Sequence, residues 1–248
     1  MTMIQLNLQQ VHARMAAACQ VAGRDPGTVS LLAVSKTFGP EAVRSAWAAG
    51  QTAFGENYIQ EAVQKIITLR QSPDLARTPL QWHCIGPIQS NKTRLVAEHF
   101  DWVQTVDRLK IAERLSEQRP TGLAPLQVCI QVNVDGGPTK SGVLPQDALL
   151  LAQQVAALPG LRLRGLMSIP EPAPDFVAAT QVFMRVRALF DALNASGLAL
   201  DTLSIGMSAD LEPAIHAGST MVRVGSAIFG TRALPIDSPA GSSPSTLG

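Results

Sequence analysis

The sequence has no excess of charge of either sign and no long uninterrupted hydrophobic run. Twenty basic residues stand against nineteen acidic ones, and no basic stripe of the kind that binds nucleic acid or an anionic membrane stands out. The longest apolar windows, such as residues 149–158, are interrupted by glutamine or proline and are too short to span a bilayer. We therefore expect neither a nucleic acid nor a membrane as a partner.

Cysteine is also scarce, and its spacing argues against several roles. Cys19, Cys84 and Cys129 are widely separated, embedded in apolar segments and without the spacing of a metal site. This pattern is typical of reduced core residues in an intracellular protein, so we expect no metal. The N-terminal stretch lacks the basic-then-apolar order of a secretory signal, which favours the cytoplasm.

Short β-type runs alternate with segments of helical periodicity. The runs suited to strands are residues 30–35, 52–54, 81–85, 102–106, 126–132, 163–169, 202–205 and 221–224. The helical segments are residues 5–22, 41–49, 58–69, 92–97, 108–118, 145–157, 176–196 and 212–217. Such alternation predicts a parallel α/β sheet. Eight units in this length predict a closed (β/α)8 TIM barrel with an extra N-terminal helix.

An open, doubly wound sheet is the structural alternative. Such a sheet carries a glycine fingerprint after its first strand, and SKTFGP at residues 35–40 lacks the G-x-G-x-x-G spacing. No interior linker divides the chain, so we predict one barrel domain over residues 1–232. Residues 233–248 have little to bury, and we expect them to form a disordered tail.

Polar residues follow the predicted strands, at the ends where a barrel of this kind has its active face. Gly206 and Ser208 follow the seventh strand, and Gly225 and Ser226 follow the eighth. The corresponding region of such barrels commonly binds phosphate, because glycines let the backbone approach an anion and hydroxyls add donors. We therefore expect a phosphate site after the last two strands.

Lys36 ends the first predicted strand, and the residues alone leave two interpretations open. A lysine at a strand end commonly extends its amine into solvent. A lysine in a partly desolvated barrel mouth loses its proton more readily, and the neutral amine can form a Schiff base with an aldehyde. If that aldehyde belonged to a phosphorylated cofactor, the predicted phosphate site would hold the cofactor's other end.

A series of motifs resembles the pyridoxal phosphate homeostasis protein family, over roughly residues 6–232. The motifs are LLAVSKT at 31–37, FGENYIQEA at 54–62, WHCIGPIQSNK at 82–92, GLMSIP at 165–170, IGMSADLEPAI at 205–215 and GSTMVRVGSAIFGTR at 218–232. The resemblance implies a fold like the N-terminal barrel of alanine racemase, with pyridoxal 5′-phosphate held as a Schiff base. SKTFG replaces the SKTKP common in the family, which removes a second lysine beside Lys36.

The resemblance also implies which residues bind the cofactor. The family's cofactor lysine falls on Lys36, and the arginine that faces the pyridine nitrogen falls on Arg223. The remaining predicted contacts are Ser208, Gly225 and Ser226 at the phosphate, Asn57 at the cofactor's edge, and His83 and Met167 lining the pocket.

An arginine opposite the pyridine nitrogen disfavours protonation of that nitrogen and so weakens carbanion stabilisation. Racemases of this fold also use a base from an added β-domain, and the single tyrosine, Tyr58, lies at a predicted helix start instead. We therefore expect a monomeric carrier that controls intracellular cofactor supply without efficient catalysis, with pyridoxal phosphate-dependent apo-enzymes as recipients. The alternatives are a single-domain, cofactor-dependent amino-acid racemase, and an aldolase that uses Lys36 directly on its substrate.

Two further charged residues have open roles. Lys140, in the loop after the fifth predicted strand, either attacks the Lys36 adduct and helps transfer the cofactor or is a solvated loop lysine. Glu56 either orients its neighbours or is solvated.

Overall fold

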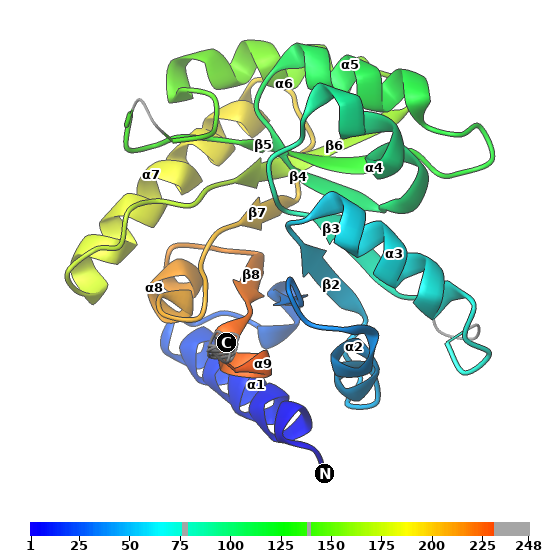
Figure 1. The fold of residues 1–248 in the computed structure, drawn as a ribbon. Helices are drawn as coiled ribbons and strands as arrows, with labels where there is room; N and C mark the ends of the chain where they lie inside the picture. The colour runs from blue at the N-terminus through cyan, green and yellow to red at the C-terminus, as the bar shows by residue number, and fades with distance from the viewer. Residues whose placement is uncertain (76–78, 138–139, 231–248) are drawn as a thin grey trace, which may run out of the picture.

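The computed structural model describes residues 1–75, 79–137 and 140–230. Its eight strands form a closed, wholly parallel barrel in which each strand pairs with the next and β8 pairs with β1 (Figure 1). The strands are β1 (Ser30–Val34), β2 (Ala53–Glu56), β3 (Gln81–Cys84), β4 (Trp102–Val106), β5 (Leu126–Gln131), β6 (Leu161–Met167), β7 (Thr202–Ser204) and β8 (Met221–Val224). The predicted (β/α)8 barrel is confirmed.

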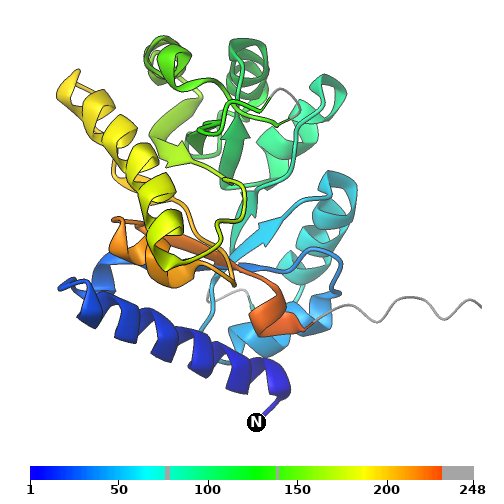
Figure 2. The same ribbon diagram turned by 90° about the vertical axis from the view of Figure 1, so that its left-hand side faces the viewer.

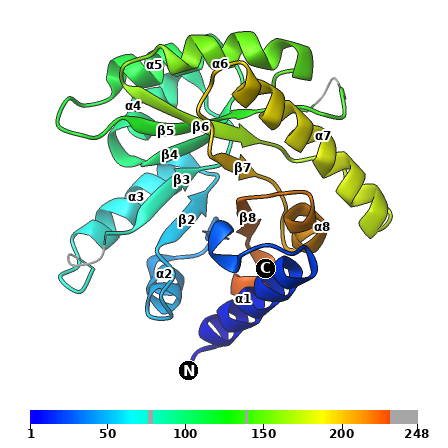
Figure 3. The same cartoon turned by 180° about the vertical axis from the view of Figure 1, so that it is seen from behind.

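Helices surround this barrel (Figures 1 and 3). They are α1 (Met3–Val21), α2 (Pro40–Trp47), α3 (Ile59–Arg70), α4 (Thr93–His99), α5 (Leu109–Gln118), α6 (Ala148–Ala156), α7 (Phe176–Ala195), α8 (Leu211–His216) and α9 (Ser226–Phe229). Short 3-10 turns occupy Pro26–Thr28, Ser90–Lys92 and Pro145–Asp147. No described helix has both the length and the apolar composition needed to cross a membrane.

The extra N-terminal helix is present and lies against α2, α8 and α9 (Figure 2). It begins two residues earlier than the hydrophobic spacing predicts because Thr2 and Gln5 form a capping box, in which each side chain accepts the other's backbone N–H. Its buried face carries Leu8, Val11 and Met15 at helical spacing.

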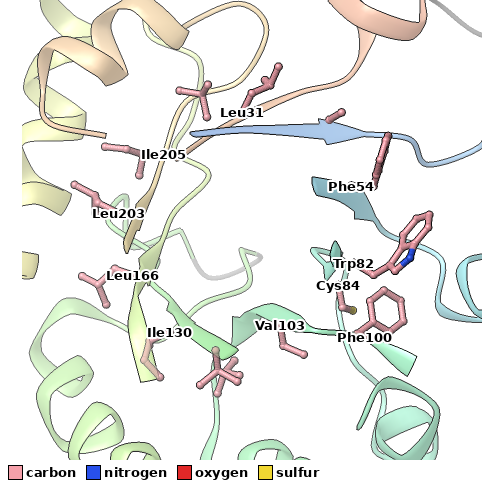
Figure 4. Close-up of a cluster of buried hydrophobic side chains, with 14 of the residues drawn as sticks. Leu31, Phe54, Trp82, Cys84, Phe100, Val103, Ile130, Leu166, Leu203 and Ile205 are labelled. Atoms are coloured by element: carbon pink, nitrogen blue, oxygen red, sulfur yellow. The ribbon is translucent and has the colours of Figure 1, made fainter. Parts of the chain in front are cut away.

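Most of the buried apolar side chains lie between the strands and the helices. Successive strands contribute outward-facing members such as Leu31, Phe54 and Trp82 (Figure 4). The barrel interior is different, because only a small apolar cluster of Trp102, Cys129 and Met167 lies apart from the main core. Buried polar side chains such as His83, Gln104 and Arg223 share the interior with other apolar ones such as Leu32 and Met221.

The differences from the predicted elements are local. The strand predicted over residues 163–169 begins instead at Leu161, which pairs with Leu126, and ends at Met167. The predicted helix over residues 145–157 divides into a 3-10 turn and α6. Helix α9 was not predicted. The tail predicted over residues 233–248 lies outside the described residues.

Candidate functional site

The carboxyl ends of β7, β8 and β1 lie side by side because β8 pairs with both of its neighbours. In the β1–β8 register, Ala33 lies opposite Val224, so Gly225 follows beside Val34. A Cβ added to Gly225 would lie 3.3 Å from both the Cβ and the carbonyl oxygen of Val34, which is tight. Lys36 follows two residues later and is exposed. The predicted lysine and the predicted phosphate loop therefore occupy adjacent parts of one rim.

Lys36 lies in a tight turn that leaves β1. The Ser35 N–H donates to Gly55 O (3.0 Å), and the Phe38 N–H returns to Ser35 O (3.1 Å). Between them, Thr37 has a φ of +68°, in the left-handed region that β-branched residues rarely adopt. Lys36 is thus held between a paired strand residue and a strained turn residue.

Backbone donors gather where β7 and β8 end. No hydrogen bond joins the amides of Ser208, Ser226 or Ala227 to another residue of the described ranges. The turn before Ser208 requires a glycine, because Gly206 has a φ of +94° and a Cβ there would lie 2.5 Å from Ala214 Cβ. Unpaired amides at the start of short helical segments are suited to an anion. Unpaired amides therefore follow both β7 and β8, and their binding of a phosphate stays a prediction.

Helix α1 supports the loops after β7 and β8. Arg14 Nη2 donates to Ser208 O (3.1 Å) while its guanidinium pairs with Glu212 (2.8 Å). Asn7 Nδ2 donates to Ile228 O in α9 (2.9 Å). Residues distant in sequence thus fix the backbone on which the free amides lie.

Arg223 is buried inside the barrel without an acidic partner among the described residues. Its Nη1 donates to Ser204 O (2.7 Å) and Ser204 Oγ (2.8 Å), and its Nη2 donates to Ser168 O (3.0 Å). Burial lowers the pKa of Arg223 to about 10, so the side chain remains a cation at neutral pH. Its Nε makes no hydrogen bond to another residue in the described part of the chain. Three of its five N–H groups therefore have partners in the described ranges, which leaves the Nε–H and one Nη2–H for a ligand.

A line of hydrogen bonds continues from Arg223 through the barrel interior. Ser204 Oγ donates to Gln104 Oε1 (2.7 Å), and Gln104 Nε2 lies 3.0 Å from His83 Nδ1. His83 Nε2 in turn lies 3.0 Å from Gln81 Oε1. Because Gln104 Oε1 already accepts, its amide donates to His83, which makes His83 a neutral imidazole protonated on Nε2. In each of these hydrogen bonds the donor lies nearer to Arg223 along the series than its acceptor does. Each group along the series therefore presents an acceptor toward the Arg223 cation.

The structure places His83 and Met167 inside the barrel. His83 stacks on Trp102 with ring centroids 5.0 Å apart, and its partner Gln81 lies at the amino end of β3, away from the rim. Burial lowers the pKa of His83 to about 3, so it is a poor base. Met167 closes β6 and packs in the interior cluster. Contact of either residue with a rim ligand stays a prediction.

Asn57 follows β2 and carries an unused acceptor. Its Oδ1 is buried and has no hydrogen-bond partner in the described part of the chain. The backbone of Asn57 lies so close to Gly86 that a Cβ there would be 2.2 Å from the Asn57 carbonyl oxygen. Glycine at position 86 therefore lets the loops after β2 and β3 approach each other, and Asn57 remains available to a donor on a ligand.

Lys65 was not predicted to belong to the site. It lies on the buried face of α3, where its Nζ donates to Ser35 O (3.0 Å) and Glu56 Oε1 (2.8 Å). Burial raises the pKa of the Glu56 carboxyl, although Lys65 and the Ser35 hydroxyl act in the opposite direction. Glu56 therefore orients its neighbours. A lysine at core spacing in α3 was the signal that could have revealed this pair.

Lys140 is paired with two carboxylates and remains partly exposed. Its Nζ lies 2.9 Å from a carboxylate oxygen of Asp135 and 2.9 Å from one of Glu171. Partial burial lowers the pKa of Lys140, but the hydrogen bonds to these two carboxylates outweigh it and raise the pKa overall. Attack by this amine would require the ion pairs to open and the proton to leave. Within the described ranges, no cluster of histidine, cysteine, aspartate or glutamate could hold a metal ion.

Comparison with known proteins agrees with this architecture. The family described as alanine racemase, N-terminal domain, matches residues 6–233. The pyridoxal phosphate homeostasis protein of Pseudomonas aeruginosa is 59% identical over 232 residues, which cover 94% of this chain and 97% of that protein. Its counterpart in Escherichia coli is 52% identical over 226 residues, covering 91% and 95%.

Solved structures give the same result. PipY of Synechococcus elongatus, solved with pyridoxal phosphate bound, superimposes with a TM-score of 0.73 at 36% identity, covering 87% of this chain and 100% of that one. Alanine racemase of Clostridium difficile has a TM-score of 0.66 at 15% identity, covering 91% and 57%, and shows the fold alone. The chain therefore belongs to the pyridoxal phosphate homeostasis protein family, whose barrel has the fold of the alanine racemase N-terminal domain.

Proposed function

We propose that this protein binds pyridoxal 5′-phosphate through a Schiff base to Lys36 and serves as a monomeric cytoplasmic carrier of the cofactor. The observation that carries the proposal is the meeting of three features at neighbouring strand ends: the Lys36 amine, the buried Arg223 cation and the free amides after β7 and β8. PipY, a relative at 36% identity, was solved with this cofactor bound.

The residues present fit the cofactor. A phosphate dianion suits the amides of Ser208 and Ser226, which are unpaired within the described ranges, and glycine at position 225 lets this loop lie close against Val34. A pyridine nitrogen is an acceptor, which suits the unused Nε–H of Arg223. Asn57 Oδ1 is a buried acceptor without a partner in the described ranges, which suits a donor on a ligand.

When bound, the cofactor would supply an aldehyde that condenses with an amine to form a C=N bond and water, and hydrolysis or replacement by a second amine would free the first amine again. Lys36 contributes the amine and is exposed, so an incoming acceptor can reach it. Arg223 keeps its own proton, because its lowered pKa of about 10 still lies well above neutrality. A cation held opposite the ring nitrogen disfavours protonation there, which supports carriage over amino-acid chemistry.

The visible spectrum of the purified protein, before and after borohydride reduction, tests the proposal. We expect a yellow protein whose colour is lost in Lys36→Ala and retained in Lys110→Ala, a matched exposed lysine on α5. Mass analysis of the reduced wild type should place one cofactor adduct on Lys36. A colourless protein that forms no adduct when mixed with pyridoxal 5′-phosphate would contradict cofactor binding and leave the aldolase interpretation.

Two further measurements separate a carrier from a racemase. Exchange of the α-proton of added amino acids should be slow, and rapid, stereochemically complete exchange would establish the racemase. Transfer of bound cofactor to an apo-enzyme that requires pyridoxal 5′-phosphate should restore that enzyme's activity. The release rate in Lys140→Ala decides whether Lys140 takes part, because an unchanged rate would exclude a role.

A further inference from the structure

The backbone before Lys36 is fixed by two buried side chains. Ser35 Oγ donates to Glu56 Oε1 (2.6 Å), and Lys65 Nζ donates to the Ser35 carbonyl oxygen (3.0 Å). Glu56 and Lys65 are themselves joined at 2.8 Å, and their side chains are only 0% and 3% exposed. Ser35 is therefore held at its hydroxyl and at its carbonyl by groups that have no access to water.

The backbone after Lys36 is held by Glu61, which lies on α3 like Lys65. Thr37 has a φ of +68°, and its N–H donates to Glu61 Oε1 (3.1 Å). The same oxygen lies 3.6 Å from Lys65 Nζ. A β-branched residue persists in the left-handed region only when its surroundings impose that conformation. The hydrogen bond from the Thr37 N–H to Glu61 holds Thr37 in this conformation.

We propose that Glu61 and Lys65 are positioning residues that fix the peptide units on both sides of Lys36 and so direct its amine toward the barrel mouth. The inference rests on the proposed function, since it concerns the amine that binds the cofactor. Helix α3 supplies both residues, one turn apart, and Glu56 on β2 completes the arrangement. Glu56, Glu61 and Lys65 can act in this way without contacting the cofactor.

The test measures how fast Lys36 forms its adduct after apo-protein is mixed with pyridoxal 5′-phosphate. We expect Glu61→Ala to slow formation about tenfold, the effect of losing one charge-assisted hydrogen bond. Glu61→Gln should react faster than Glu61→Ala and closer to the wild type, because its amide oxygen can still accept from the Thr37 N–H, through a weaker neutral hydrogen bond. Glu113→Ala, which removes an exposed glutamate of α5 that pairs with no described residue, should react like the wild type.

Two additional readouts separate positioning from a general loss of stability. In the apo-protein, amide hydrogen exchange at Thr37 should be faster in Glu61→Ala than in the wild type, whatever the cofactor does. Thr37→Gly in the Glu61→Ala background should restore part of the rate, because glycine adopts the left-handed conformation at little cost. A residue that only stabilised the fold would not be rescued in this way.

The outcomes are distinct. A wild-type protein that forms no adduct overturns the proposed function itself. A wild type that reacts while Glu61→Ala reacts equally fast overturns only the positioning role. The role is also overturned if Glu61→Gln is as slow as Glu61→Ala, or if Glu113→Ala is equally slow. Slowing that is largest in Glu61→Ala and smaller in Glu61→Gln, with rescue by Thr37→Gly, supports it.

Discussion

Ser204 Oγ donates a 2.7 Å hydrogen bond to Gln104 Oε1, which joins β7 to β4 across the barrel interior. Through Ser204 this bond orients acceptors toward the guanidinium of Arg223. A buried cation without a carboxylate partner is costly unless several dipoles face it. The series of hydrogen bonds through Ser204, Gln104 and His83 therefore stabilises the buried Arg223 cation.

Gln104→Leu should destabilise the protein. The substitution leaves the Ser204 hydroxyl and His83 Nδ1 without their partners, and each unsatisfied buried group costs about 1–3 kcal/mol. Urea denaturation should report the loss in the free energy of unfolding. Gln154→Leu, on the exposed side of α6, is the matched control and should change it little. Equal stabilities of the two variants would show that the interior line contributes nothing.

His83 should make the fold sensitive to acid. Burial lowers its pKa from 6.5 to about 3, so below pH 6.5 the unfolded chain binds a proton that the folded chain excludes. Stability from this residue is complete above 6.5 and is lost as the pH falls toward 3. At about pH 4.5 the loss is about 2–3 kcal/mol, at roughly 1.4 kcal/mol per unit.

The measurement compares wild type with His83→Gln, whose amide can still bond to Gln104 and Gln81. Between about pH 7 and pH 4.5 the free energy of unfolding should fall about 2–3 kcal/mol further in the wild type than in the variant. The raised pKa of Glu56 changes stability in the opposite direction but is common to both proteins. Parallel pH profiles would show that His83 does not titrate as its burial requires.

Lys65→Ala should be severely destabilising, because it leaves the Glu56 carboxylate buried without its cation. Removing one partner of a buried ion pair typically costs about 3–5 kcal/mol. The double variant Lys65→Met with Glu56→Gln removes both charges and should lose less. Chemical denaturation of Lys65→Met, Glu56→Gln and the double variant measures the coupling, and strictly additive losses would argue against the pair.

Gly86→Ala should disturb the loop that carries Asn57. The new Cβ would lie 2.2 Å from the Asn57 carbonyl oxygen, so one backbone must move, at a cost of about 1–3 kcal/mol. Gly122→Ala is the matched control, because nothing lies within 4 Å of a Cβ there. Thermal unfolding and cofactor titration should both distinguish the two variants, and identical behaviour would contradict the close approach.

The barrel could be predicted from the sequence because its strands are buried on both faces and alternate regularly with helices. The rim residues Lys36, Ser208 and Gly225 were also predictable, since the ends of parallel strands share one edge. Helix α9 has only four residues, too few to show a period. The depth of His83 in the barrel depends on strand tilt and register, which no local pattern encodes.

The role of Lys65 escaped prediction for a related reason. Its partners Ser35, just after β1, and Glu56, on β2, lie 30 and 9 residues before it, and all three come together only when the helix after β2 packs back against the barrel. A lysine on a helix is normally exposed, and only its tertiary partners make burial tolerable.

The contacts of α1 have a consequence for any shortened form of this protein. A deletion of the first two dozen residues would remove no strand, although it would uncover the core against which Leu8, Val11 and Met15 pack. It would also remove the Arg14 guanidinium from the Ser208 carbonyl and the Asn7 amide from Ile228. Such a truncated protein should be less stable and should bind an anion more weakly, since α1 both packs on the core and holds the loops after β7 and β8.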